Sequence, residues 1–368
     1  MEYKPEVAYD ALPELPPQVD VESADVLRAC VRAARALAEV KGAGEKIPNQ
    51  AILINAIPLQ EAKLSSEIEN IVTTQDDLFQ GALDEANVKD PHTKEVLRYR
   101  AALRMGYESL EHQPLNLELI RSVCSTLLDE DVEFRPAGKG VRIFNHAMGR
   151  TTYTPPMGGP NMFSKLENLE EYLLSRDGPD PLIRMAVGHY QFEAIHPFTD
   201  GNGRTGRILN ILYLLHAGLL EIPVLYLSRF IIGSKQDYYR LLRAVTENGD
   251  WEPWVLYMLR GIEETAAWTT DRIDEIRELF DSTVERCRDA APKIYSKELV
   301  ELIFRQPYCK IAFLVEAGIA QRQTASEYLQ ELQEIGILEG EKKGREVVYR
   351  HPALIRVLTA DMSTPSTD

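Results

Sequence analysis

The sequence is poor in cysteine and in positive charge. Its four cysteines, Cys30, Cys124, Cys287 and Cys309, lie far apart and include no C-x-x-C pair. This spacing argues against a disulfide framework or a zinc site and favours reduced thiols in a cytoplasmic protein. The formal net charge of −16 argues against a protein that coats nucleic acid or an anionic membrane, although it leaves room for a small basic site.

Targeting and membrane-spanning segments are also lacking. The first 20 residues are acidic and contain four prolines, which predicts an extended arm without the basic and apolar regions of a signal peptide. The most apolar run, residues 208–220, is interrupted by Asn210 and His216 and is shorter than the roughly 20 apolar residues that span a bilayer. We therefore expect no membrane partner.

Hydrophobic periodicity predicts a mainly α-helical protein without repeats. Two glycines, at positions 42 and 44, should end the first helix, and Pro58 should break or kink the second. The predicted helices are 22–40, 50–64, 93–110, 117–128 after the cap Asn116, 167–174, 181–195, 208–220, 237–247 and 251–289.

Two regions depart from this pattern. Between residues 134 and 156, two β-prone runs flank a turn and predict a hairpin, which as an isolated pair is better suited to receive another strand than to form core. Beyond Pro292, three helices precede a strand, a charged turn and a strand, which is typical of a winged helix. The predicted parts are an N-terminal helical region (1–110), a helical core (111–290), a winged-helix domain (291–361) and a tail (362–368).

The richest chemistry lies in residues 196–207, which read H-P-F-T-D-G-N-G-R-T-G-R. The apolar run follows directly, so this stretch should lie at a helix N-terminus, where free amides and the helix dipole favour a phosphate. Histidine has a pKa near neutrality, so His196 can take a proton from a hydroxyl. Asp200 is a single carboxylate beside a phosphate site, which is typical of a Mg²⁺ ligand.

The neighbouring residues extend this phosphate site. Gly201, Asn202 and Gly203 let the backbone approach and hold an anion. Arg204 and Arg207 lie three apart on the first helical turn and can both face phosphates. Each feature alone is ordinary, as a capping histidine, a turn or a solvated arginine pair. Together they indicate phosphoryl or nucleotidyl transfer from a nucleoside triphosphate, and the sequence has neither a Walker A nor a kinase motif.

These twelve residues match the motif H-P-F-x-[DE]-G-N-G-R-x-x-R at every defined position, so the sequence resembles the Fic family. The resemblance covers about residues 115–258 and, more loosely, the N-terminal helices. It implies a helical Fic core with a hairpin flap and an enzyme that moves AMP from Mg²⁺-bound ATP to a hydroxyl of a target protein. Kinase-like Doc relatives carry lysine in place of Gly203, so this glycine favours AMP transfer.

The resemblance also implies a role for each matched residue. His196 would deprotonate the target hydroxyl, Asp200 would hold Mg²⁺, and the hairpin at 141–154 would dock the target by strand addition. Tyr238 and Tyr239 resemble tyrosines that line the adenine site, with ordinary core packing as the alternative for the pair. The implied nucleotide-binding residues are Gly201, Asn202, Gly203, Arg204, Thr205, Gly206, Arg207 and Tyr239.

The stretch S-S-E-I-E-N that begins at Ser65 has two interpretations. Ser66 and Glu69 fit a capping box at the start of a helix. Ser65, Glu69 and Asn70 also fit the inhibitory motif [ST]-x-x-x-E-[GN] of class II Fic proteins. In that interpretation Glu69 pairs with Arg207 in the place of the γ-phosphate, and ATP binds in an unproductive pose.

Three functions stay open at this point. The first is an autoinhibited adenylyltransferase, the second a hydrolase that removes AMP with Glu69 positioning a water, and the third an ATP-sensing transcriptional regulator. The predicted recognition helix carries Arg322 but also Glu327, Glu331 and Glu334, which favours protein docking or dimerisation over DNA binding. The family's habit of pairing adds a homodimer to the expected partners, beside ATP and the target protein.

Overall fold

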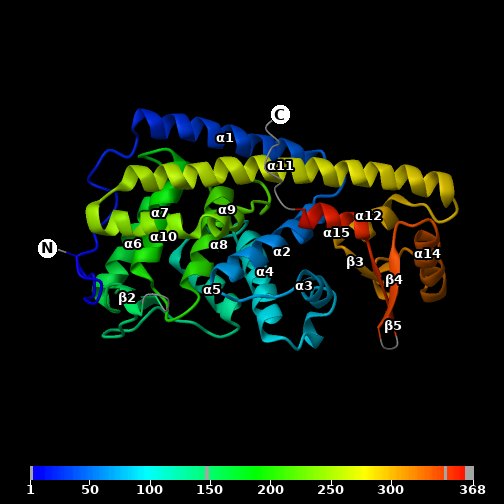
Figure 1. Cartoon of the computed structure of the whole chain (residues 1–368), viewed down its shortest axis with the longest axis horizontal. Coiled ribbons are helices and arrows are strands. Elements are labelled where there is room, and N and C mark those ends of the chain that lie inside the picture. Colours follow the sequence, from blue (N-terminus) through cyan, green and yellow to red (C-terminus); the bar gives the residue numbers. More distant parts are fainter. Residues whose placement is uncertain (1–2, 146–148, 344–345, 361–368) are drawn as a thin grey trace.

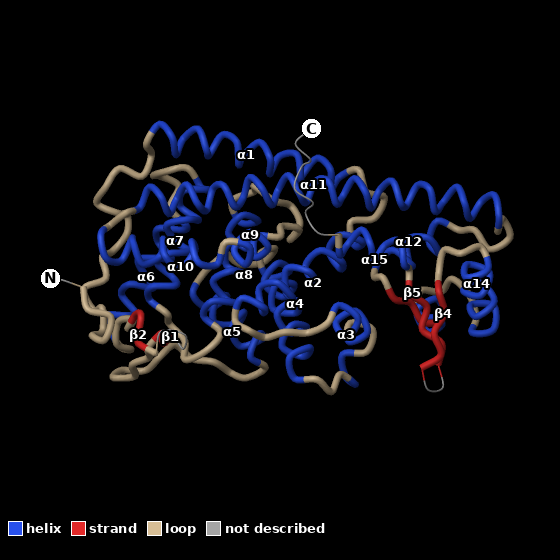
Figure 2. Tube along the Cα trace, in the orientation of Figure 1, coloured by secondary structure: helices blue, strands red, loops and turns tan. Residues whose placement is uncertain are grey.

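The computed structural model describes residues 3–145, 149–343 and 346–360 (Figure 1). The chain is mainly α-helical, as predicted, with two small antiparallel sheets (Figure 2). The α-helices are α1 (Ala24–Glu45), α2 (Ala51–Ile68), α3 (Gln75–Gly81), α4 (Pro91–Ser109), α5 (Leu117–Leu128), α6 (Pro160–Leu174), α7 (Pro181–Ile195), α8 (Asn202–His216), α9 (Leu227–Gly233), α10 (Lys235–Asn248), α11 (Trp251–Ala290), α12 (Lys297–Arg305), α13 (Ile311–Glu316), α14 (Arg322–Glu334) and α15 (Pro352–Thr359). The strands are β1 (Ile143–Asn145), β2 (Arg150–Tyr153), β3 (Tyr308–Lys310), β4 (Glu339–Lys343) and β5 (Glu346–Arg350).

Helices α1 and α11 run side by side in the same direction along one side of the molecule (Figure 1). Nε of Arg32 lies 3.0 Å from Oε2 of Glu263 across this pair. Helix α1 continues through Gly42 and Gly44 to Glu45, so the predicted glycine stop was wrong. Gly44 is buried, and its Cα faces the side chain of Ile222, so tertiary packing keeps the last turn helical despite its weak propensity.

Helix α2 runs through Pro58 and extends four residues beyond its predicted end at residue 64. Proline removes one backbone hydrogen bond, but α2 is buried against α4 and α9, and this packing outweighs the loss. The predicted capping box was wrong, because Ser66 and Glu69 end a helix and do not begin one. Glu69 is the C-cap, and Asn70 follows with φ of 64°, a left-handed conformation that asparagine tolerates better than most residues.

Helices α7 and α8 form the centre of the molecule and are buried nearly all round. Asp180 caps α7 and Pro181 opens it, as predicted. Helix α8 begins at Asn202, six residues before the apolar run, so half of the 196–207 motif is helical. The other half forms the connection between the two helices; α4 and α5 contact α8, and α6 contacts α7.

The predicted hairpin is present as β1 and β2, with Ile143 paired to Tyr153 and the turn at 146–148 outside the described residues. The proline-rich N-terminal arm lies against β2. Tyr9 N donates to the Thr154 carbonyl at 2.9 Å, and the hydroxyl of Tyr3 donates to the Thr152 carbonyl at 3.2 Å. The arm therefore covers one edge of the hairpin.

A C-terminal unit, residues 297–359, follows α11. It contains the predicted three helices and two strands, and two further elements that were not predicted, β3 and α15. Strand β3 completes a three-stranded antiparallel sheet in the order β3-β5-β4. The unit packs on the second half of α11 and on α2, with Nδ2 of Asn49 donating to Oε2 of Glu301 at 2.8 Å.

No helix within the described residues is long and apolar enough to cross a membrane.

Helices α3 and α9 were also not predicted, and α6 begins at Pro160, earlier than expected. Both missed helices are only seven residues long, too short for a helical period to be clear in the sequence.

Candidate functional site

His196 lies where α7 ends, in a left-handed conformation with φ of 51° and ψ of 60°. Its N–H donates to the Phe192 carbonyl at 2.9 Å, which closes the last turn. Burial lowers the pKa of the imidazole to about 4, and the nearby Arg135 cation acts in the same direction. The ring is therefore neutral at physiological pH, which is the form that can accept a proton.

The side chain of Asn202 supports the connection between α7 and α8. Its Oδ1 accepts a hydrogen bond from Phe198 N at 2.8 Å, and its Nδ2 donates to the Phe198 carbonyl at 2.9 Å. Phe198 is itself fully buried and stacks on Phe134. The side-chain amide of Asn202 is thus used within the protein, and only its backbone N–H is open to an anion.

The first turn of α8 offers a helix N-terminus without a side-chain cap. Gly201 is the N-cap with φ of 76°, a left-handed conformation that glycine adopts at little cost. The first amides of the helix have no acceptor within it, so they can bind an anion. Gly203 lies in this turn, and the absence of a side chain there leaves room above the amides.

Asp200 is the exposed carboxylate of the site. Its Oδ1 accepts a hydrogen bond from Gly201 N at 2.6 Å. Among the described residues there is no group of three or more histidine, cysteine, aspartate or glutamate side chains that could form a complete metal cage. A lone carboxylate of this kind fits Mg²⁺, which takes its other ligands from water and phosphate.

Both arginines of the motif point into the protein and are at most 4% exposed. Nη1 of Arg204 lies 3.0 Å from Oε2 of Glu95, while its buried Nε has no partner among the described residues. Arg207 contacts the end of α2 through three bonds: Nε donates to Oγ of Ser65 at 2.7 Å, and Nη2 donates to the Ser65 carbonyl at 3.0 Å and to Oε1 of Glu69 at 2.9 Å.

The carboxylate of Glu69 lies over the first turn of α8. A side chain at position 203 would collide with Oε1 of Glu69, so the glycine is what admits this carboxylate. Burial opposes ionisation of Glu69, but the facing Arg207 holds its pKa below the ordinary value. An anion therefore occupies a position between a helix N-terminus and a buried arginine, where a phosphate would also be stabilised.

Contacts outside the motif hold α2 in this position. Nζ of Lys235 donates to the Ile68 carbonyl at the end of the helix. Near the middle of α2, the buried carboxylate of Glu61 accepts hydrogen bonds from Ser228 N at 3.0 Å and from the hydroxyl of Tyr99 at 3.3 Å. Burial raises the pKa of Glu61 to about 7. Sequence reasoning missed these residues because each partner lies far away in the chain.

The two consecutive tyrosines of α10 differ in their surroundings. Tyr238 is buried, its hydroxyl is 2.8 Å from Nε2 of His189, and its ring packs against Trp254. Tyr239 is 42% exposed. Core packing, the alternative considered for the pair, describes Tyr238, while the ring of Tyr239 is accessible to a ligand.

Two further residues of the site, Arg135 and the half-buried Glu193, carried no sequence signal. Arg135 is fully buried and donates to the His196 carbonyl at 2.9 Å. Glu193 lies one turn before His196 and faces Gly206, with no partner for its Oε1 within the described residues. Burial raises the pKa of Glu193 to about 7.

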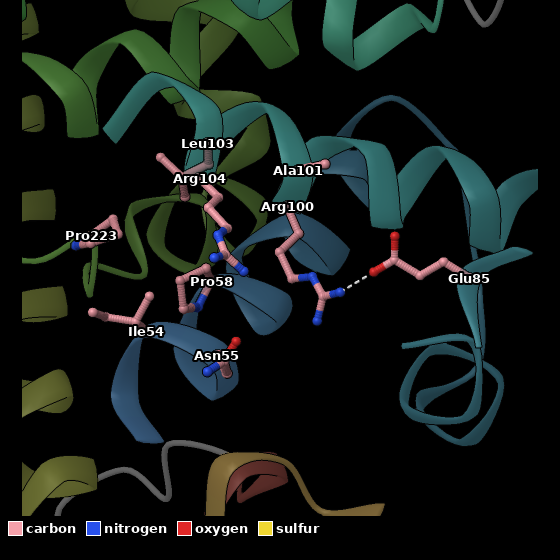
Figure 3. Close-up of a pocket in the computed structure, with 9 residues that line it drawn as sticks. All are labelled: Ile54, Asn55, Pro58, Glu85, Arg100, Ala101, Leu103, Arg104 and Pro223. Carbon is pink, nitrogen blue, oxygen red and sulfur yellow. Dashed lines mark hydrogen bonds and ion pairs between the residues drawn. The ribbon is translucent and has the colours of Figure 1, made fainter. Parts of the chain in front are cut away.

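A cavity of about 180 Å³ lies between α2 and α4 (Figure 3). Two arginines point toward it, but Arg100 is paired with Glu85, and Nε of Arg104 lies 2.7 Å from Oε1 of Glu108. Its lining includes no residue of the 196–207 motif or of the stretch from Ser65 to Asn70, so it is separate from the candidate site.

Three protein-family models match the chain. The Fic/DOC family N-terminal model matches residues 27–108, and the Fic/DOC family model matches residues 114–214. The model for the C-terminal domain of SoFic-like protein adenylyltransferases matches residues 279–354. The first two matches cover the end of α2 and the 196–207 motif.

Curated relatives match part of the chain. The protein adenylyltransferase Fic of Nematostella vectensis is 29% identical over 186 residues, which are 47% of this chain and 40% of that protein. The protein adenylyltransferase fic-1 of Caenorhabditis elegans is 31% identical over 176 residues, which are 46% of this chain and 32% of that protein. The chain thus spans less than half the length of these relatives.

Solved structures share the fold. A Fic family protein from Desulfovibrio desulfuricans G20 has a TM-score of 0.57 at 21% identity and covers 92% of this chain and 98% of its own. A segment of Fic-1 from C. elegans has a TM-score of 0.52 at 20% identity and covers 68% of this chain and 74% of its own. At these identities the similarity concerns the fold.

Proposed function

The chain belongs to the Fic/DOC family, and we propose that it is an autoinhibited protein adenylyltransferase. It would move AMP from ATP to a serine, threonine or tyrosine hydroxyl of a protein and release pyrophosphate. The observation that carries this proposal is the carboxylate of Glu69, which lies 2.9 Å from Nη2 of Arg207 and over Gly203. It occupies the position where this motif would bind a phosphate.

The residues of the connection and of α8 would have different roles in the reaction. His196, which is neutral, takes the proton of the target hydroxyl while that oxygen attacks the α-phosphorus and pyrophosphate leaves. The amides of the first turn of α8 and the two motif arginines, Arg204 and Arg207, hold the phosphates. Mg²⁺ held by Asp200 would neutralise phosphate charge. Thr205 and Gly206 continue this helix, and Tyr239 offers an exposed ring for the adenine.

Inhibition follows from competition for one guanidinium. Nη2 of Arg207 already donates to Glu69, and Ser65 holds the same side chain in place. A γ-phosphate at this position would lose its arginine and meet a second anion. ATP would then bind only in a pose from which AMP is not transferred.

The test is labelling of proteins with ATP that carries the label on its α-phosphate. Wild type should label weakly, Glu69→Gly at least tenfold more strongly, and Glu69→Gly with His196→Ala not at all. Equal labelling by wild type and Glu69→Gly would refute the inhibitory contact. No labelling by Glu69→Gly with any target or nucleotide would refute the transferase.

One observation also favours removal of AMP as a second function. The carboxylate of Glu69 lies over Gly203 in the first turn of α8 and 2.9 Å from Nη2 of Arg207, so it is placed to orient a water at the anion site. A modified target offers the discriminating substrate. Release of AMP by wild type that disappears in Glu69→Gly would support hydrolysis, and retention of AMP by both would exclude it.

The remaining partners follow from the same proposal. The target would dock on the hairpin of β1 and β2, whose β2 edge is already covered by the N-terminal arm. DNA binding by the C-terminal unit has little support, because α14 exposes two acidic side chains, Glu327 and Glu334, which would repel phosphates. We therefore do not propose a transcriptional role.

A further inference from the structure

We infer that Arg135 is a positioning residue. It fixes the position of the base His196 relative to both ends of the hairpin on which the target would dock. This inference rests on the proposed transferase function and deepens it.

The guanidinium of Arg135 donates only to backbone carbonyls. At the end of α7, Nη2 reaches the Ile195 carbonyl at 3.0 Å and Nε the His196 carbonyl at 2.9 Å. At the hairpin, Nη1 reaches the Lys139 carbonyl at 2.9 Å and Nη2 the Pro156 carbonyl at 2.8 Å. Lys139 and Pro156 lie before β1 and after β2, so one side chain joins both ends of the hairpin to the catalytic connection.

The burial of Arg135 explains why its four hydrogen bonds to carbonyls matter for stability. The residue is fully buried, and no carboxylate within the described residues pairs with it. A buried charge without a partner is costly, so the carbonyl dipoles must compensate it together. Loss of one carbonyl contact therefore weakens the compensation for the whole group, which makes the four contacts interdependent.

The same contacts support a strained backbone. His196 is left-handed without being glycine, and the last carbonyls of α7 have no acceptor bond within the helix. Arg135 binds the carbonyl of Ile195, the last residue of α7, and that of the C-cap His196, and its own N–H donates to the Pro197 carbonyl at 2.9 Å. The hydroxyl of Tyr153 on β2 adds a parallel link to the Ala194 carbonyl at 2.8 Å. The hairpin and the base therefore have a fixed relative position.

Arg135 does not contact the residues proposed to bind the nucleotide. Its acceptors lie in the α7 end and the hairpin, whereas the anion site lies on α8. Removal of the guanidinium should then misplace the base relative to the target hydroxyl and leave ATP binding intact. A misplacement of about 1 Å can cost roughly 100-fold in rate.

The experiment compares Arg135→Lys and Arg135→Met in the Glu69→Gly background. We expect kcat to fall roughly 100-fold in Arg135→Met and roughly 10-fold in Arg135→Lys, since one ammonium cannot reach four carbonyls with a fixed fork. KM for the target protein should rise, and affinity for a non-hydrolysable ATP analogue should stay within twofold. The matched control is Arg28→Met, which removes an arginine that is 70% exposed on α1. Unchanged kcat, or a parallel loss of ATP affinity, would overturn the inference.

A second measurement does not depend on activity. Amide hydrogen exchange should quicken in residues 139–145, 149–156 and 195–200 of Arg135→Met, while α8 keeps its protection. If Glu69→Gly alone transfers no AMP, the proposed function fails, and this exchange pattern still decides the role of Arg135. Exchange that is unchanged, or that quickens across the whole chain, would contradict a positioning role.

Discussion

At the scale of single residues, the proposed inhibition depends on one contact, the ion pair between Arg207 and Glu69. Arg207 is almost completely buried, whereas the side chain of Glu69 is 37% exposed. Water therefore partly screens the electrostatic attraction between the two charges, and the hydrogen bond from Nη2 of Arg207 to Oε1 of Glu69 fixes the orientation of the pair. A change of charge at Glu69 should act more mildly than removal of the side chain.

We expect Glu69→Gln to label targets about tenfold more than wild type but less than Glu69→Gly. Glutamine keeps the shape that fills the space over Gly203 and loses the charge-assisted bond to Arg207, which is worth about 1.5–3 kcal/mol. Labelling initial rates for the three proteins at one ATP concentration provide the comparison. If Glu69→Gln labelled no more than wild type, the inhibition would be steric and not electrostatic.

The imidazole of His196 should not titrate in the usual range. Burial and Arg135 lower its pKa to about 4, so the neutral form persists as the pH falls from 8 to 5.5. NMR should show no shift of this ring over that interval, with assignment by comparison to His196→Ala. The same ring in urea, where an ordinary histidine titrates near 6.5, is the control. A midpoint near 6.5 in the folded protein would contradict the electrostatic description.

At the scale of elements, α2 is a core helix, and Glu69, the carboxylate proposed to inhibit the site, is its C-cap. Its interior carboxyl, Glu61, is 1% exposed and has a pKa raised to about 7. A raised folded pKa means that the stability contribution is complete below the unfolded pKa of about 4.3 and is lost as the pH rises through 7. Ionisation of Glu61 should therefore weaken the attachment of α2 to α9.

Glu61→Gln should make stability less dependent on pH. Between pH 5 and pH 8 the wild type should lose free energy of unfolding, on the order of 3 kcal/mol if Glu61 acts alone. The variant should lose less, because its amide does not ionise, although Glu193 keeps a similar pKa and part of the effect. Urea unfolding at the two pH values measures both losses. Identical losses would show that Glu61 does not cause the dependence.

Some elements could be predicted from sequence patterns alone, and others could not. The 196–207 motif carries its chemistry in consecutive residues, so its placement at the start of α8 could be expected. The stretch from Ser65 to Asn70 was harder, because a capping box and an inhibitory motif share Glu69, and only the fold shows that it closes α2. The end of α1 was misjudged because the packing of Gly44 depends on residues far away in the chain.

At the scale of the whole molecule, the C-terminal unit contacts the chain both before and after α2, the helix that ends at Glu69. Asn49, before α2, donates to Glu301, while Tyr308 donates to Asp76 at the start of α3. Nζ of Lys310 lies 4.0 Å from Oδ2 of Asp84. None of these contacts could be predicted from the sequence, because each joins residues more than 200 positions apart.

Loosening these contacts should release part of the inhibition. We expect Tyr308→Phe with Lys310→Met to raise basal labelling two- to fivefold, since a partly buried hydrogen bond and a long ion pair of this kind contribute roughly 0.5–1 kcal/mol in total. Lys343→Met, on the far strand β4, is the matched control, because its ion pair with Glu341 is local. Labelling equal to wild type in the double variant would mean that the C-terminal unit does not stabilise the position of α2.

The shared chain of Glu69 and Arg207 has a consequence for regulation in a cell. In the proposed mechanism Glu69 acts as a tethered ligand, and its effective concentration at the site is set by the fold and does not change on dilution. The inhibited fraction should therefore be independent of how much of the protein is present. What can change it is ATP, by mass action, or a partner that moves α2. Such a protein would respond to nucleotide supply and to mechanical displacement of one helix, and not to its own abundance.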